Sequence, residues 1–104
     1  MNTFNDRERA FEAKFAHDAE MQFKAIARRN RLLGQWAAAL LKKTPEESAA
    51  YATEVVKADM EEPGDDDVLR KLLSDLGDIA DEKTIRAQMK VLLLEAKEQI
   101  LSEF

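Results

Sequence analysis

The sequence predicts an all-α protein: an antiparallel four-helix bundle with a mobile or projecting N-terminal arm. Three observations favour this fold. The 104 residues include only 3 Gly and 2 Pro, so turns are few and the elements between them are long. Apolar residues recur at the three-and-four spacing of amphipathic helices in four segments. Short stretches of capping and turn residues separate these segments, as expected for an up-down bundle.

The first helical pattern is the longest and runs from Phe4 to Leu41. We expect a helix that begins near Asp6 and continues to Leu41, about 57 Å if the pattern from Phe4 is unbroken, roughly twice the depth of a domain of this size. Part of it should therefore project. We expect one domain, 1–104, in which residues 1–20 form an arm and residues 21–104 form the bundle. The apolar stripe of this pattern comprises Phe4, Phe11, Phe15, Ala19, Phe23, Ile26, Leu33, Ala37 and Leu40.

The second helix is expected over about Pro45–Met60. Thr44 and Glu47 have the spacing of a capping box, with proline at the first helical position. The helix should stop at the chain-breaking pair Pro63-Gly64. Its core residues are small ones that permit close helix approach: Ala49, Ala52, Val55 and Val56.

The third helix should begin at the acidic residues 65–67, and Gly77 should end it, with Ile79 making the apolar contact that accompanies a glycine cap. The fourth should begin at Asp81 and end near Ser102. The core stripes of these two helices are Val68, Leu69, Leu72, Leu73 and Leu76, and then Ile85, Met89, Leu92, Leu93, Ala96 and Ile100.

Charge is distributed unevenly along the chain. Residues 1–43 carry nine basic and five acidic side chains, a net charge of +4, whereas residues 44–67 carry one and nine, a net charge of −8. This separation could steer the N-terminal part toward an acidic partner surface while the middle of the chain repels nucleic acid. The charges could equally be the solvated faces of a bundle, and the pattern leaves both interpretations open.

Enzyme chemistry lacks the residues it needs. The chain has no Cys, and its one imidazole, His17, lacks the Glu-x-x-His spacing of di-iron bundles, since Lys14 stands three residues before it. The acidic stretch around Gly64 does not match a calcium-binding loop, because Pro63 and Arg70 occupy ligand positions. We expect no catalytic residue, no metal site and no required cofactor.

The N-terminus is polar and charged, and no uncharged apolar run of about 18 residues is present. We therefore expect no signal peptide and no direct membrane insertion. A cytoplasmic location is the resulting expectation.

Arg28, Arg29 and Asn30 interrupt the first apolar stripe with polar groups. Without a phosphate-binding glycine loop, and with acidic residues at the other helix starts, these side chains are the remaining candidates for an anion site that binds ADP or ATP. The alternative is that Arg29 pairs with a carboxylate of another helix. A nucleic-acid site is disfavoured by the net charge of −5 and by the absence of interleaved aromatic residues.

The front of the chain places Phe4, Phe11 and Phe15 in an otherwise charged segment. A phenylalanine stripe usually belongs to a core, but this spacing also suits an amphipathic helix that binds in a groove of a partner. The candidate partner-binding residues are Phe4, Arg7, Phe11, Lys14 and Phe15.

The runs FNDRERAFEAKFAHD (4–18) and FKAIARRNRLLGQWAA (23–38) resemble the zeta subunit of alphaproteobacterial F-type ATP synthases, a family formerly of unknown function. Residues 50–56, 67–71 and 85–89 resemble it more loosely. The resemblance implies a four-helix bundle that inhibits ATP hydrolysis when its N-terminal helix enters a catalytic subunit interface. It also implies alpha, beta and gamma subunits as partners, adenine nucleotide as a ligand, and a peripheral position at the inner membrane through the ATP synthase. The alternative function is a nucleotide sensor without an inhibitory arm.

Overall fold

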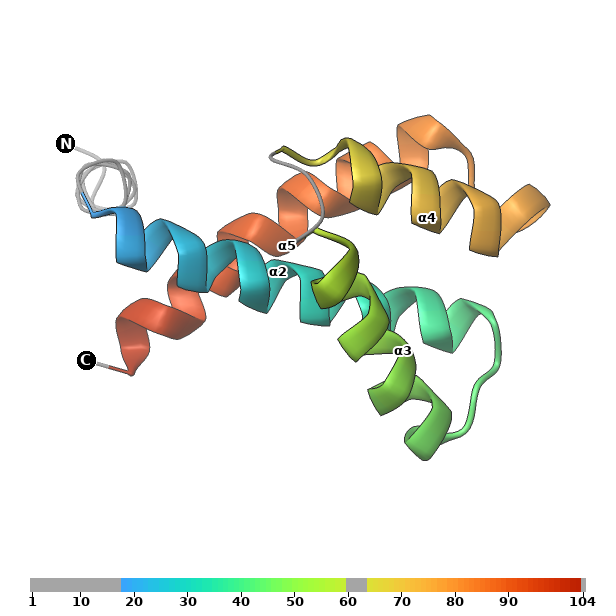
Figure 1. Ribbon diagram of the computed structural model, residues 1–104, viewed down its shortest axis with the longest axis horizontal. Helices are drawn as coiled ribbons and strands as arrows, with labels where there is room; N and C mark the ends of the chain where they lie inside the picture. The colour runs from blue at the N-terminus through green and yellow to red at the C-terminus, as the bar shows by residue number, and fades with distance from the viewer. Residues whose placement is uncertain (1–17, 60–63, 104) are drawn as a thin grey trace, which may run out of the picture.

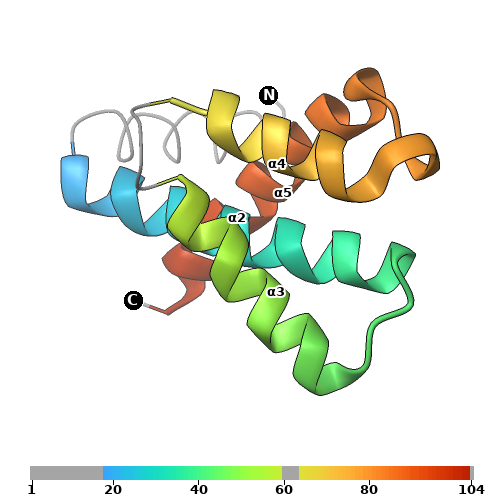
Figure 2. The same cartoon turned by 45° about the vertical axis from the view of Figure 1, so that its right-hand side comes forward.

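The computed structural model describes residues 18–59 and 64–103, and every secondary-structure element in these ranges is a helix. The elements are α2 (Ala19–Leu40), α3 (Pro45–Ala58), α4 (Asp66–Leu76), the short 3-10 helix η1 (Gly77–Ile79) and α5 (Glu82–Ser102). Successive α-helices reverse direction, and α3 returns obliquely across α2 (Figures 1 and 2). The predicted antiparallel four-helix bundle is confirmed. Within the described part of the chain, no helix is long and apolar enough to cross a membrane.

The predicted single helix from Asp6 to Leu41 is wrong at Asp18. The backbone of Asp18 is extended, with φ −123° and ψ 100°, and its carboxylate accepts a hydrogen bond from the Met21 amide at 3.1 Å. This short acidic side chain caps α2, and a cap of this kind competes with helix continuation. Residues 1–17 lie outside the described residues, as does all but the end of the predicted arm.

The connection between α2 and α3 is made by local backbone geometry. Lys42 adopts a left-handed conformation with φ 58°, and the Lys43 amide donates to the Ala38 carbonyl at 3.0 Å, as in a Schellman cap. The predicted capping box follows: the Thr44 amide donates to Glu47 Oε1 at 2.9 Å, and the Glu47 amide donates to Thr44 Oγ1 at 3.2 Å. The chain therefore reverses within four residues.

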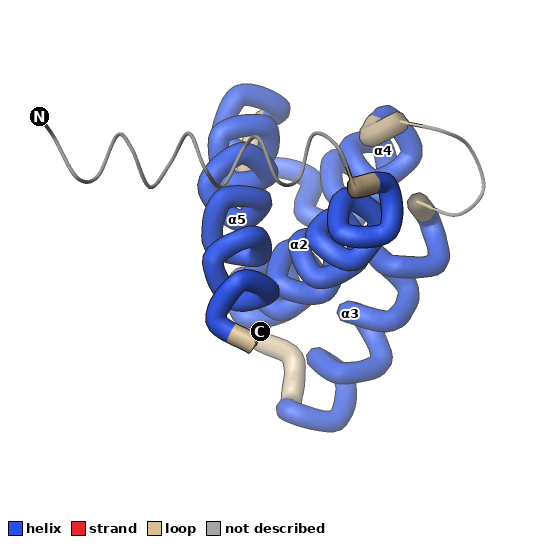
Figure 3. The backbone as a smooth tube through the Cα atoms, turned by 90° about the vertical axis from the view of Figure 1, so that its left-hand side faces the viewer, coloured by secondary structure: helices blue, strands red, loops and turns tan. Residues whose placement is uncertain are grey.

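α2 is the central helix and contacts α3, α4 and α5 (Figure 3). Its closest approach is to α3, where Gly34 faces Ala52. A methyl group at Gly34 would lie 2.5 Å from the Cα atom of Ala52, far inside van der Waals contact. Ala52, one of the small residues predicted for the second helix, allows this close approach together with Gly34 of α2.

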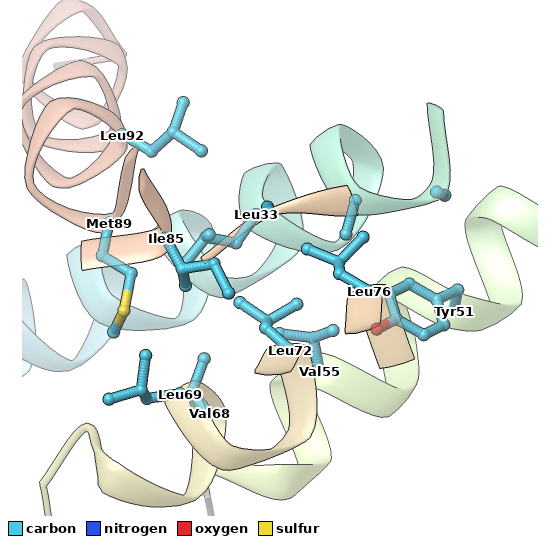
Figure 4. Packing of buried hydrophobic residues seen from close by; sticks show 13 residues of the cluster. Leu33, Tyr51, Val55, Val68, Leu69, Leu72, Leu76, Ile85, Met89 and Leu92 are labelled. Atoms are coloured by element: carbon cyan, nitrogen blue, oxygen red, sulfur yellow. The ribbon is translucent and has the colours of Figure 1, made fainter. Parts of the chain in front are cut away.

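The main core lies among α2, α3, α4 and α5, and their apolar side chains converge in Figure 4. Its residues are Leu33, Ala37, Ala38, Tyr51, Val55, Val68, Leu69, Leu72, Leu76, Ala80, Ile85, Met89 and Leu92. A smaller cluster of Met21, Ala25 and Ile100 joins the start of α2 to the end of α5. The two clusters lie on either side of Arg29 and Asn30 along α2.

The predicted apolar stripe of α2 is partly wrong. Phe23 is 64% exposed and Leu40 is 37% exposed, whereas Met21 and Ala25 are buried. The physical reason is that the N-terminal turns of α2 contact α5 through Met21 and Ala25, which lie on the side of the helix opposite Phe23, so Phe23 stays largely exposed. The periodicity of the sequence predicts an apolar stripe, but it does not predict which side of the helix a neighbouring helix will cover.

Two further burial predictions are wrong. Ala49 is exposed, because α3 turns Tyr51, Ala52 and Val55 toward its neighbours instead. Gly77 does end α4 with φ 55°, but Ile79 is 52% exposed and Ala80 makes the buried apolar contact. The 3-10 turn after Gly77 rotates the chain so that Ala80 faces the core.

Gly34→Ala should destabilise the bundle by about 2 kcal/mol. Overpacking costs about 1–3 kcal/mol, and the methyl group would meet backbone atoms of α3. The helix propensity of alanine offsets this by only about 1 kcal/mol. Denaturant unfolding followed by circular dichroism measures the change, and the exposed neighbour substitution Gln35→Ala is the matched control. A Gly34→Ala variant as stable as the wild type would show that α2 and α3 do not approach this closely.

Candidate functional site

The predicted partner-binding residues Phe4, Arg7, Phe11, Lys14 and Phe15 lie outside the described residues, as does His17. The predicted nucleotide-binding residues Arg28, Arg29 and Asn30 are described. The structure brings two of these three together and turns the third toward a different helix.

Arg28 faces the end of α5. Its Nη1 donates to Gln99 Oε1 at 3.1 Å, and its Nη2 lies 2.8 Å from Glu103 Oε1. The side chain is partly exposed, so this contact stabilises the fold only modestly. Arg28 therefore connects the middle of α2 to the last turn of α5.

Arg29 and Asn30 form the polar interior of the bundle, with exposed fractions of 2% and 1%. Arg29 donates from Nε and Nη2 to Asn30 Oδ1 at 3.0 and 2.8 Å. Its Nη2 also donates to Asp65 Oδ1 at 2.9 Å. Asp65 immediately precedes α4, so the expectation that Arg29 pairs with a carboxylate of another helix is confirmed. We define Arg29, Asn30, Asp59 and Asp65 as the polar cluster.

Asp59 connects the polar cluster to the end of α3. It is the C-cap residue of α3 and accepts a hydrogen bond from Asn30. Burial raises the pKa of Asp59 above its usual value, and the nearby carboxylates of Asp65 and Asp67 raise it further, while the Asn30 hydrogen bond and the Arg29 charge act in the opposite direction. The end of α3 and the start of α4 are thus both held on α2.

Asp65 shows the effect of this pairing on local structure. It occupies the N-cap position of α4 but makes no side-chain capping bond, because its carboxylate is directed to Arg29. Asp67, in the first turn of α4, pairs with Arg70 through Oδ1, and its buried Oδ2 has no hydrogen-bond partner among the described residues. At the start of α4, the long-range ion pair between Asp65 and Arg29 therefore takes the place of a local capping bond.

The polar cluster carries more negative than positive charge, since Arg29 is its only cation. An entering phosphate would compete with Asp65 for the guanidinium and would meet the repulsion of Asp59. In the ranges that the structure describes, no group of three or more acidic or imidazole side chains is arranged to hold a metal ion. The geometry therefore supports a role in holding the helices together.

Sequence reasoning missed a second polar group, built around Tyr51 of α3. The buried Tyr51 hydroxyl donates to Asp75 Oδ2 on α4 at 2.7 Å, and Lys71 Nζ lies 3.0 Å from the same carboxylate oxygen. The ammonium groups of Lys43 and Lys71 lie 5.5 and 5.0 Å from the centre of the Tyr51 ring, within cation–π range. A tyrosine within an apolar helix stripe was the available signal, but its partner is 24 residues away.

Two pKa shifts follow from this contact. Burial raises the pKa of Tyr51, and the hydrogen bond to Asp75 with its negative charge adds to the effect. Burial also acts to raise the pKa of Asp75, but the hydrogen bonds from Tyr51 and Lys71 outweigh it and lower the pKa of this carboxyl overall. The contact thus favours the protonated tyrosine and the ionised aspartate.

The family model described as "ATPase inhibitor subunit zeta" matches residues 1–99. A protein structure determined by solution NMR is 51% identical to the chain, with a TM-score of 0.75. The match covers 81% of this chain and 99% of that one. No curated protein matches the chain.

Arg29→Ala should lower the free energy of unfolding by about 2–3 kcal/mol, because it removes the donor to the buried Asn30 and the cation beside the partly buried Asp59. Arg28→Ala is the matched control, and it should cost less than about 1 kcal/mol because its side chain and that of Glu103 are partly hydrated. Urea unfolding of both variants measures the difference. Equal losses in the two variants would contradict the structural role of the polar cluster.

Tyr51→Phe should cost about 1 kcal/mol at neutral pH through loss of the hydrogen bond to Asp75. A raised pKa in the folded state means that this contribution is fully present below the ordinary tyrosine pKa, about 10, and is lost as the pH rises above it. The stability difference between the wild type and Tyr51→Phe should therefore shrink from pH 9 to pH 11 in urea unfolding. A difference that stays constant over this range would refute the assignment.

Proposed function

The chain belongs to the ATPase inhibitor subunit zeta family, and we propose that it inhibits ATP hydrolysis by the catalytic head of an F-type ATP synthase through its N-terminal arm. The arm, residues 1–20, would enter an interface formed by a catalytic subunit. Rotation in the hydrolytic direction would then be blocked. The proposed partners are the alpha, beta and gamma subunits of the head.

The observation that carries this proposal is the extent of the family match, which includes the segment before the Asp18 cap as well as the bundle. In the bundle, Arg29 is bonded to Asn30 and Asp65, and Tyr51 is bonded to Asp75, so these polar side chains are occupied by contacts within the fold. The arm carries three phenylalanines among charged residues. We therefore assign binding to the arm and support to the bundle.

Inhibition of this kind requires no chemistry from the inhibitor. An arm anchored by Phe4, Phe11 and Phe15 would act as a wedge, with Arg7 and Lys14 adding positive charge. We propose a regulatory protein without catalytic residues, metal or required cofactor. It would work on the cytoplasmic side, held peripherally at the inner membrane through the ATP synthase.

Adenine nucleotide binding at Arg28, Arg29 and Asn30 stays a prediction, and so does the alternative function of a nucleotide sensor. Arg28 contacts the end of α5, while Arg29 and Asn30 face Asp59 and Asp65. A phosphate bound by all three residues would have to separate Arg29 from Asp65. ADP titration followed by amide chemical shifts tests this directly, since binding there should perturb Asp65 together with Arg28–Asn30.

Phe11→Ala should weaken inhibition of the head by about 2 kcal/mol or more, the usual cost of removing a buried aromatic anchor, and should leave the folding of the bundle unchanged. ATPase inhibition and the thermal midpoint are measured on the same variant. If Phe11 instead belongs to the core of the bundle, the change should remove about 3–5 kcal/mol of stability. A large fall in the midpoint, with inhibition restored at a lower temperature where the variant is folded, would disprove the arm mechanism.

A further inference from the structure

One row of residues on α2 changes its surroundings along the helix. Phe23, Ala27, Asn30, Gly34 and Ala38 follow one another at helical spacing and share a face. The last three are buried, and Gly34 packs against Ala52 of α3. Phe23, by contrast, is 64% exposed. The row therefore begins on the surface and ends in the core.

The reason is the length of α3. α3 has 14 residues and α2 has 22, which correspond to about 21 and 33 Å at 1.5 Å per residue. Asp59, at the end of α3, hydrogen bonds with Asn30, so α3 stops level with this residue. The N-terminal turns of α2 extend past α3, as the blue end of the ribbon shows in Figure 1. Phe23 is exposed because α3 ends before reaching it.

Single exposed apolar residues are common on soluble proteins, and Phe23 differs from them in its position on the helix. Phe23 lies five residues after Asp18, about 7.5 Å along the helix axis, and Asp18 is where residues 1–17 are attached to the bundle. The partly buried Ile26 lies on the same side, one turn further along, and the exposed Ala19 lies one turn before Phe23. A partner that binds the arm is therefore held near this apolar surface, because the arm is attached to the bundle at Asp18.

Charged side chains border the surface. On the flank beside Phe23, Glu20 and Lys24 are both exposed and pair with each other at 3.5 Å. Such an exposed pair contributes little to stability and can rearrange at small cost when a partner binds. This flank carries one charge of each sign, so the matching surface is mainly apolar.

We propose that Phe23 and Ile26 form a second contact with the ATP synthase head, next to the one made by the arm. This inference rests on the proposed function and deepens it, because it places part of the inhibitory interface on the folded bundle. The occupant is an apolar surface of the head. The contact orients the bundle once the arm is bound, and it adds to the affinity through the short connection between them.

The test compares Phe23→Ala with Leu94→Ala in the full chain. Leu94 is an exposed apolar residue of α5 and serves as the matched control. For Phe23→Ala, the concentration for half-maximal inhibition of the head's ATPase activity should rise about tenfold, and for Leu94→Ala it should stay within about twofold. Neither variant should change the thermal midpoint, because both side chains are exposed. Phe23→Leu, which keeps an apolar side chain, should retain most of the inhibition.

Phe11→Ala, measured in parallel, separates this inference from the proposed function. Unimpaired inhibition by Phe11→Ala would remove the arm mechanism itself. Weakened inhibition by Phe11→Ala together with full inhibition by Phe23→Ala would overturn the second contact alone. A lower thermal midpoint for Phe23→Ala would show that the ring is packed within the fold. A wild-type dimer that Phe23→Ala dissociates would assign the surface to a second copy of the chain, and either result overturns the proposal.

Discussion

The positive charge of Arg29 has to be neutralised inside the bundle, and this requirement determines how the helices are connected. An unpaired buried ion costs several kcal/mol, so the guanidinium needs carboxylates at a defined place. Asp65, before α4, supplies the direct partner, and Asp59, after α3, reaches the same point through Asn30. The end of α3 and the start of α4 are therefore tied to one position on α2. Two of the acidic residues in the stretch 44–67, Asp59 and Asp65, therefore help to neutralise the buried arginine.

The same position divides α2 into two parts with different roles. On the C-terminal side, Leu33, Gly34 and Ala37 are enclosed by the other helices in the main core. On the N-terminal side, α5 alone among the described helices supplies the buried contacts, through the small cluster with Met21 and Ala25. Leaving one flank uncovered costs the bundle little, because its main core does not depend on that flank. An uncovered flank beside the attachment point of residues 1–17 is compatible with the partner contact that we propose for this surface.

Local signals in the sequence predicted local structure well. The capping box at Thr44 and the helix start at Asp81 were predictable, because each side chain bonds to an amide three residues ahead and the whole interaction lies within one turn. The exposure of Phe23 could not be predicted, because it depends on where another helix stops. In the candidate site, the adjacent residues Arg28 and Arg29 lie about 100° apart around the helix, so they point to different neighbours. The pairing of Tyr51 with Asp75 likewise exists only once α3 and α4 are packed.

The buried arginine also changes what the basic N-terminal region can offer a partner. Arg29 is neutralised within the fold and Arg28 is engaged by Glu103, so the described part of α2 presents less positive charge than its sequence suggests. Lys42 and Lys43 lie at the far end of the helix, beyond the reach of a partner at Asp18. Electrostatic steering at the arm end of the bundle therefore depends on few charges and weakens with salt. Since charge contributes mainly to the rate of association, the lifetime of an inhibited complex has to come from apolar anchors, and on the described bundle Phe23 is the largest such side chain left exposed.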